Sequence, residues 1–155
     1  MRSRKPIAET AGHGASLETM PSFLLNHIVH KYHQILQSKL RSTGVSTLQM
    51  RIILSLHAHD RLTVSELCNY AIAEQPTMSR ALDSLETQGL VRRQMSETDS
   101  RLRLVSLTEK GVQVHARIHP VVIGINEAIV DGLSDDQRTA LLRQLGTLLV
   151  NLDRV

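Results

Sequence analysis

The stretch that decides the fold runs from Thr63 to Leu107 and reads TVSELCNYAIAEQPTMSRALDSLETQGLVRRQMSETDSRLRLVSL. It opens with a capping box, because Thr63 supplies a hydroxyl and Glu66 supplies a carboxylate one helical turn later. This pair predicts a helix that ends near Ala71. Proline suits the first turn of a helix, so residues 74–76 (Glu-Gln-Pro) predict the start of a second helix, which Gly89 ends. Two helices joined by so short a connection predict a helix-turn-helix.

The second of these helices is expected to have a buried face and an exposed face. Met78, Leu82 and Leu85 recur at the spacing of one helical stripe, which predicts that they enter the core. The other positions carry short hydroxyl side chains and one long cation, Arg80. Small hydroxyls allow a helix to approach a groove closely, and an arginine can make a bidentate contact to guanine. We therefore expect this helix to read DNA.

Two short strands and a loop are predicted after Gly89. Residues 90–93 and 102–107 alternate apolar and polar side chains, which is typical of half-buried antiparallel strands. Residues 97–101 between them are too polar to bury and predict a loop tip. The whole stretch therefore predicts a winged helix-turn-helix. Arginines gather in it, although the net charge of +3 is by itself too small to indicate a polyanionic partner.

Composition predicts the fold class of the rest of the chain. The chain of 155 residues is one domain-sized unit, and its 41% hydrophobic and 2% aromatic content requires a core of aliphatic side chains and methionine. This composition favours helices packed on helices, so the predicted class is mainly α with a small β-wing. A single cysteine excludes an internal disulfide framework and fits a cytoplasmic location. The sequence has neither a secretory signal nor an apolar run of about 18 residues, so no membrane partner is expected.

The segments on either side of the winged helix are predicted to be an arm and four helices. Residues 1–20 lack apolar periodicity and predict a flexible N-terminal arm, whose cations Arg2, Arg4 and Lys5 either touch the DNA backbone or are merely solvated. Helices are predicted over residues 21–40, from a capping box at Ser46, from Thr108 towards Val130, and from a capping box at Ser134. Pro120 lies inside the third of these and is expected to kink it.

Two local expectations concern the helix that begins at Ser46 and the residues after it. Residues 59–61 are predicted to form a turn. The side chains expected to point from the helix into the core are Met50, Ile53, Leu54, Leu56 and His57.

The flanking helices carry more apolar residues than a small winged helix can bury. Either the protein is a larger monomeric bundle, or these helices pack against a second copy. A homodimer is favoured, because one recognition helix with few base-reading groups binds weakly, whereas two copies on a palindrome add their contacts. We therefore expect a single domain over residues 21–155. Within it, residues 46–107 would form the DNA-binding lobe, and residues 21–45 and 108–155 would be dimerisation helices.

The order of these parts resembles the MarR family of bacterial winged helix-turn-helix transcriptional regulators over about residues 22–153. The matching segments are Ser46–Gln49, Leu62–Leu67, Gln75–Arg80, Leu85–Val91, Asp99–Arg101 and Leu104–Gly111. The resemblance implies a ligand-responsive repressor that binds a palindromic operator as an obligate homodimer. It also implies that the first and last helices form the dimer region and that a wing flanks each recognition helix in the major groove.

The resemblance also implies which residues contact DNA. The wing pattern of Asp, any residue, Arg places Arg101 in the minor groove, where the nearby carboxylate of Asp99 orients it, and the negative potential of a narrow groove favours this placement. Thr63 is first of all an N-cap, and it and Ser65 are candidate phosphate contacts at a helix N-terminus. Arg92, Arg93 and Arg103 are candidate phosphate cations, although cations at a strand edge often only keep it soluble. The recognition helix would contribute Gln75, Thr77, Ser79 and Arg80.

An effector site is a further expectation from the resemblance. Members of the family often bind small aromatic acids or phenols between the dimer region and the DNA-reading lobe, and others respond to thiol oxidation or zinc. Here the first helix, the second helix and the long helix would wall such a site for a small aromatic or acyl effector. The candidate ligand-binding side chains are His27, His30, Tyr32, Arg51 and His57.

The alternatives are a metal-responsive regulator, a protein-interaction module and an enzyme. His115 and His119 are four residues apart, a spacing that can bind zinc, but there is no cysteine among the histidines, and neither a metal site nor a cofactor is assigned. Cys68 is interpreted as inert packing. A helical interaction module without DNA binding would not need Arg80 and the Asp99–Arg101 pattern. No nucleophile motif, glycine-rich phosphate loop or pair of acids is found, so the protein is not expected to be an enzyme.

Overall fold

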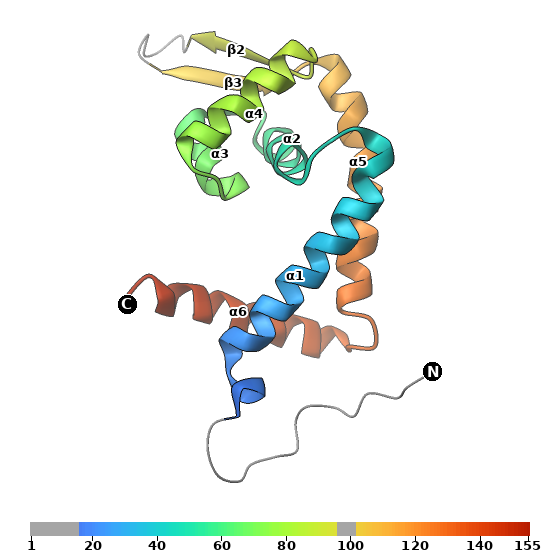
Figure 1. Ribbon diagram of the computed structural model, residues 1–155, viewed down its shortest axis with the longest axis vertical. Helices are drawn as coiled ribbons and strands as arrows, with labels where there is room; N and C mark the ends of the chain where they lie inside the picture. The colour runs from blue at the N-terminus through green and yellow to red at the C-terminus, as the bar shows by residue number, and fades with distance from the viewer. Residues whose placement is uncertain (1–15, 96–101) are drawn as a thin grey trace.

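The computed structural model describes residues 16–95 and 102–155. The predicted contacts Arg2, Arg4, Lys5, Asp99 and Arg101 lie outside these residues. The helices are η1 (Leu17–Thr19), α1 (Pro21–Leu40), η2 (Arg41–Thr43), α2 (Thr47–His59), α3 (Val64–Ala71), α4 (Gln75–Thr87), α5 (Glu109–Ile129) and α6 (Asp135–Leu152), and the strands are β1 (Arg61–Thr63), β2 (Val91–Met95) and β3 (Arg103–Leu107). The predicted fold class, mainly α with a small β-wing, is confirmed (Figure 1).

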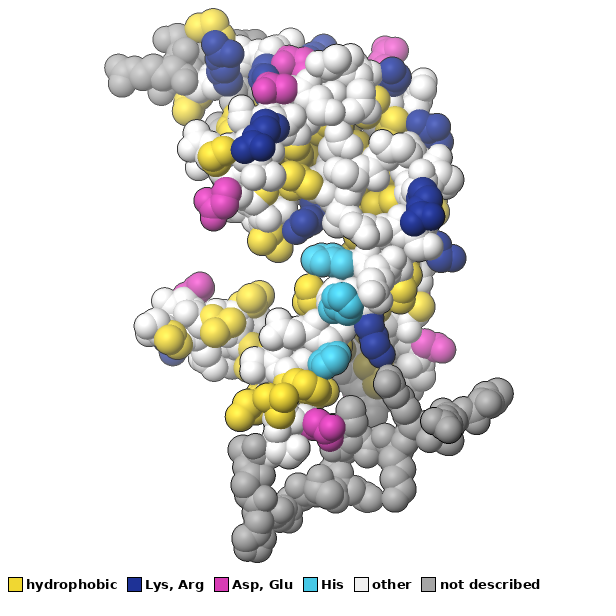
Figure 2. Space-filling view, in the orientation of Figure 1, with side chains coloured by type: hydrophobic (Ala, Val, Ile, Leu, Met, Phe, Trp, Pro, Cys, Tyr) yellow, Lys and Arg dark blue, Asp and Glu magenta, His cyan; other side chains and the backbone are white. Residues whose placement is uncertain are grey.

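The elements form a compact lobe and a set of long helices that extend from it (Figure 1). We call α2, α3, α4 and the sheet the winged-helix lobe. α5 runs away from this lobe with α1 packed across it, and α6 leaves the far end of α5 and runs sideways from it. Figure 2 shows a wide hollow between α6 and the winged-helix lobe. None of the helices in the described ranges is long and apolar enough to cross a membrane.

Local hydrogen bonds explain where the helices begin. The three predicted capping boxes are confirmed, with Ser46 and Gln49 at α2, Thr63 and Glu66 at α3, and Ser134 and Gln137 at α6. The hydroxyl of Thr108 accepts the backbone N–H of Gly111 and so caps α5 as expected. Hydrogen bonds from the backbone and then the hydroxyl of Thr63 hold the pKa of the Glu66 carboxyl below its usual value.

The sheet has three antiparallel strands in the order β1-β3-β2. Leu62 of β1 and Arg93 of β2 both lie opposite Val105 of the central strand. The prediction of a turn over residues 59–61 is wrong at Arg61, which begins β1. A strand of three residues is too short to show periodicity, and the strand that orders it lies far along the chain.

The core of the winged-helix lobe is aliphatic, as the composition predicts. Met78, Leu82 and Leu85 of α4 are fully buried, which confirms the predicted stripe. In α2 the prediction is wrong for His57, which is exposed, while the unpredicted Ile52 is fully buried. The reason is that α2 is central, since it contacts α1, α3, α4, α5 and β3, so its buried positions spread over more than one face.

α5 connects the winged-helix lobe to the outlying helices. It continues without interruption from Glu109 to Ile129, so the kink expected at Pro120 does not break the helix. Val114, Ile118, Val122 and Ile125 are its buried apolar residues. α6 follows, and its start is tied to the end of α5 by an ion pair of 2.9 Å between Arg138 and Glu127. Among the described residues, none of those in α6 is buried.

Candidate nucleic-acid interface

The turn between α3 and α4 fixes the angle between these two helices. The N–H of Ala73 donates to the carbonyl of Cys68 at 3.0 Å and closes α3, and Pro76 lies in the first turn of α4. Ile72 adopts the left-handed conformation (φ 53°) and is 78% exposed. A β-branched residue is strained in this conformation, which glycine usually adopts at helix ends. The turn therefore holds a strained, exposed isoleucine next to the recognition helix.

α4 presents the side chains that are expected to read DNA. Its Met78, Leu82 and Leu85 anchor it on the lobe, and this fixes which face turns outward. Gln75, Thr77, Ser79 and Arg80 are all exposed on this one helix. The structure therefore brings the four predicted recognition residues together.

The start of α3 lies beside the start of α4. Ser65 and Cys68 of α3 and Gln75 of α4 line one surface hollow of about 760 Å³. Thr63 is half-buried, and its hydroxyl donates to the Glu66 carboxylate at 2.8 Å and accepts the Glu66 N–H at 3.2 Å. The capping role of Thr63 is therefore observed, whereas Ser65 is exposed. Cys68 is half-buried, which fits its interpretation as packing.

The three arginines of the wing strands lie in different surroundings. Arg103 is exposed at the start of β3, and Arg92 donates from Nε to the Ser106 hydroxyl at 3.1 Å. Arg93 instead reaches from β2 back to α4. It donates to Asp83 at 2.7 Å and to Glu86 at 3.0 Å. These last contacts were not predicted, because they join residues of two elements whose packing is not visible in the sequence.

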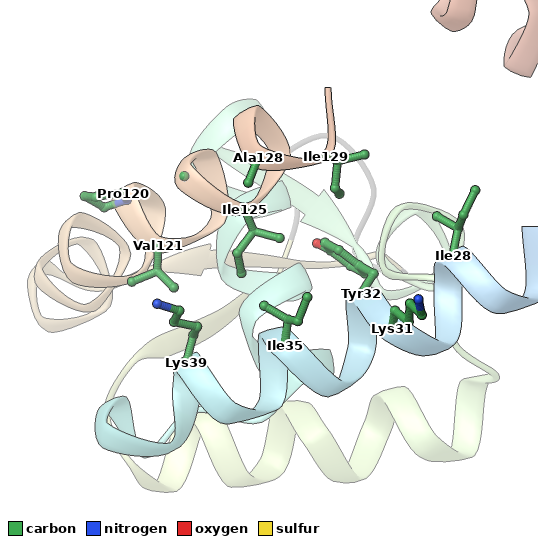
Figure 3. A pocket seen from close by; sticks show the side chains of 11 residues that line it. Ile28, Lys31, Tyr32, Ile35, Lys39, Pro120, Val121, Ile125, Ala128 and Ile129 are labelled. Atoms are coloured by element: carbon green, nitrogen blue, oxygen red, sulfur yellow. The ribbon is translucent and has the colours of Figure 1, made fainter. Parts of the chain in front are cut away.

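The candidate ligand-binding residues do not gather in one place. Tyr32 lines a cavity of about 610 Å³ between α1 and α5 (Figure 3). His27 packs against Phe23, and His30 contacts Gln34 at 3.0 Å. Arg51 is half-buried on α2, and His57 stacks on His115.

Two lysines of this cavity were missed by sequence reasoning. Lys31 and Lys39 of α1 line it beside apolar residues of both helices. Figure 3 shows Lys39 near Val121 of α5 and Lys31 next to Ile28, with Ile35 facing Ile125 between them. The spacing of Lys31, Ile35 and Lys39, one helical turn apart, was the signal in the sequence that placed them on one face.

Three histidines form a cluster between α2 and α5. The rings of His57 and His115 stack with centroids 3.5 Å apart and an interplanar angle of 4°, and His119 lies 5.1 Å from His115. His115 is 9% exposed, and its burial, followed by the nearby His57 and His119, lowers its pKa below the usual value. Within the described ranges, no group of three or more His, Cys, Asp or Glu residues is arranged to hold a metal ion.

These features define a winged helix-turn-helix protein, and comparison with known proteins identifies its family. The sequence model of the MarR family matches residues 43–102. A MarR-family transcriptional regulator from Silicibacter pomeroyi is 34% identical, with a TM-score of 0.80, and the alignment covers 88% of this chain and 92% of that one. The chain therefore belongs to the MarR family of transcriptional regulators.

Two further proteins are also similar to this chain. The transcriptional repressor IacR of Pseudomonas putida is 26% identical over 88% of this chain and 81% of its own length. The structure of a MepR–DNA complex from S. aureus has a TM-score of 0.81 and 24% identity, covering 88% of this chain and 99% of that one, and so supports the fold.

Proposed function

We propose that this MarR-family regulator is a repressor that binds a palindromic operator as a homodimer and releases it when a small effector binds. The observation that carries the proposal is the exposure on α4 of four polar side chains suited to DNA, Gln75, Thr77, Ser79 and Arg80. Further support comes from two relatives, since IacR is named a repressor and MepR has been solved with DNA.

The DNA contacts follow from the exposure of these side chains. α4 would enter the major groove, where Arg80 and Gln75 can reach base edges and the hydroxyls of Thr77 and Ser79 allow close approach. Ser65, Thr63, Arg92 and Arg103 would contact phosphates on either side. Asp99 and Arg101 remain candidates for the minor groove.

Apolar surface outside the winged-helix lobe supports the homodimer. Leu142 and Leu149 of α6 are 71% and 67% exposed, and Ile28 of α1 and Ile123 of α5 are about half exposed. So much apolar surface on neighbouring helices marks an interaction site. We infer that residues 21–45 and 108–155 pair with a second copy, and that residues 46–107 of each copy bind one half-site.

The cavity between α1 and α5 is a candidate for the effector site. Its walls are apolar, with Ile35, Val121 and Ile125 facing one another, while Lys31 and Lys39 supply positive charge at its edge and Tyr32 supplies a hydroxyl (Figure 3). A small aromatic or acyl compound with an acidic group matches these walls, because its apolar part would be buried and its charge would be paired.

A salt titration tests the DNA-binding part of the proposal. The probe is a palindromic duplex selected by the wild-type protein from a random-sequence pool. For a dimer that neutralises about 8 phosphates, the logarithm of affinity should fall against the logarithm of salt concentration with a slope near −7. Arg80→Ala should weaken binding, whereas Arg143→Ala, which removes an equal charge from exposed α6, should not. A flat salt response of the wild-type protein would contradict the proposal.

A further inference from the structure

Arg93 connects the wing to the recognition helix. It lies in β2, and its guanidinium reaches two carboxylates of α4. Nη2 lies 2.7 Å from Asp83 Oδ1, and Nη1 lies 3.0 Å from Glu86 Oε2. Nη2 also points at the carbonyl of Ser79, 3.5 Å away. One side chain of the wing therefore holds α4 at three positions along its length.

The backbone of β2 shares in this connection. The N–H of Arg93 donates to the other oxygen of the Glu86 carboxylate at 3.3 Å. Ser79, Asp83 and Glu86 follow one another at helical spacings of four and three residues, so they lie along one side of α4. This side is distinct from the buried stripe of Met78, Leu82 and Leu85. Arg93 therefore restrains the rotation of α4 about its own axis as well as its distance from β2.

The charges around Arg93 make it a poor phosphate contact. One guanidinium faces two carboxylates, so the cluster carries a net negative charge, and both terminal nitrogens already have acceptors. The Arg93 side chain is 20% exposed, and its Nε is buried. Arg103, on the neighbouring strand, is by contrast exposed. A phosphate that approached Arg93 would have to displace carboxylates that are already in place.

We propose that Arg93 is a positioning residue that fixes the wing against the recognition helix and so sets the geometry in which both elements meet DNA. The proposal rests on the proposed DNA-reading function and replaces the expected role of Arg93 as a phosphate cation. Specific binding requires α4 and the wing to reach their two grooves together, and a prearranged pair loses less conformational freedom on binding. Non-specific binding depends on phosphate neutralisation and does not require this alignment.

Arg93→Ala tests this role, with Arg103→Ala as the comparison for a phosphate-binding arginine. Affinity is measured for the selected palindromic duplex and for a scrambled duplex of equal length, over a salt series and well below the melting temperature of each variant. Arg93→Ala should weaken specific binding by roughly tenfold, an effect as large as the removal of one base-reading side chain. It should leave the scrambled duplex and the salt slope unchanged. Arg103→Ala should weaken both duplexes and reduce the slope by about one for each phosphate that is no longer neutralised.

Removal of the acidic partners provides a second variant, for which a positioning role and a phosphate-binding role predict different results. In Asp83→Asn combined with Glu86→Gln, Arg93 remains but has no charged partners on α4. A positioning role predicts that the ratio of specific to non-specific affinity falls as it does in Arg93→Ala, and that combining all three substitutions adds little. A phosphate role predicts that the freed arginine tightens binding to both duplexes and steepens the salt slope.

Three results would overturn the proposal. The first is weaker binding of Arg93→Ala to both duplexes with a shallower slope, and the second is wild-type specificity of Arg93→Ala at a lowered melting temperature. The third is tighter binding of the doubly neutralised variant to both duplexes with a steeper slope. Each differs from a failure of the proposed function itself, in which the wild-type protein would show no salt-dependent preference for any selected duplex.

Discussion

At Gly111 the first turn of α5 passes against the backbone of Leu90, at the end of the loop that precedes the wing. The carbonyl of Leu90 also accepts the N–H of Thr108 at 3.0 Å, so it cannot move aside without losing that bond. A Cβ on Gly111 would collide with this carbonyl and would lie 3.1 Å from the Leu107 side chain. This glycine is therefore required by close approach.

We expect Gly111→Ala to lower the free energy of unfolding by about 1–3 kcal/mol, the usual cost of overpacking. Gly124→Ala is the matched control, since it lies in the same helix with no heavy atom within 4 Å of the added methyl. It should raise the free energy of unfolding by roughly 0.5–1 kcal/mol, because alanine favours helix. Urea denaturation at one fixed protein concentration measures both, and equal effects would contradict the close-approach argument.

At the scale of single residues, sequence reasoning found the side chains whose roles are local. The capping pairs and the polar face of α4 depend on residues within two helical turns, so their spacing was enough. Ile72 was not found, because an isoleucine gives no sign of a left-handed conformation. The contacts of Arg93 with Asp83 and Glu86 were also missed, since they depend on how β2 packs on α4.

At the scale of elements, the contact between α2 and α5 contains the stacked pair His57 and His115. Burial and the neighbouring histidines lower the pKa of His115 below its usual value of 6.5. As the pH falls through that value, the unfolded chain takes up a proton that the folded protein does not. The free energy of unfolding should therefore be fully retained above about pH 6.5 and decrease as the pH falls from there towards the folded-state pKa.

His115→Asn tests this expectation by removing the titrating ring. Over the range of about pH 5–8, the free energy of unfolding of this variant should depend less on pH than that of the wild type. His33→Asn, a change at an exposed position of α1, is the control and should leave the wild-type dependence in place. If the free energy of unfolding of His115→Asn depended on pH as steeply as that of the wild type, groups other than His115 would cause the pH dependence.

The helices were predicted more completely than the strands. Proline, glycine and capping residues mark helix ends within a few positions, and the predicted start of α1 at Pro21 is confirmed. β1 has no such signal, because it is ordered by pairing with β3. The burial of Ile52 and the exposure of His57 were missed for a related reason, since α2 packs against several elements at once.

At the scale of the whole molecule, the buried apolar cluster does not extend to α6. Figure 2 shows the hollow that separates this helix from the winged-helix lobe, with histidine side chains along its inner wall. Four leucines form a stripe along α6 at helical spacings of three and four residues: Leu142, Leu145, Leu149 and Leu152. Leu149 is 67% exposed. In the proposed homodimer this stripe is covered by the second copy.

We expect Leu149→Glu to weaken the dimer by at least about 3 kcal/mol, because each copy loses a leucine worth roughly 1.5–3 kcal/mol when buried. Sedimentation should show a shift towards single chains, and affinity for the palindromic duplex should fall while the winged-helix lobe stays folded. Thr147→Glu adds the same charge to an exposed position off the stripe and should remain dimeric. If sedimentation gave Leu149→Glu the same molecular mass in solution as the wild-type dimer, this stripe would be excluded from the interface.

The lack of buried residues in α6 also has a consequence for the lifetime of the protein in the cell. A copy without a partner presents a leucine-rich helix to proteases and chaperones, whereas a paired copy hides it. Degradation would then remove unpaired chains first, and the turnover rate would rise as the amount of regulator falls. We therefore expect the half-life of the protein to depend on its own abundance. The half-life should become short when the abundance falls below the concentration at which two copies associate.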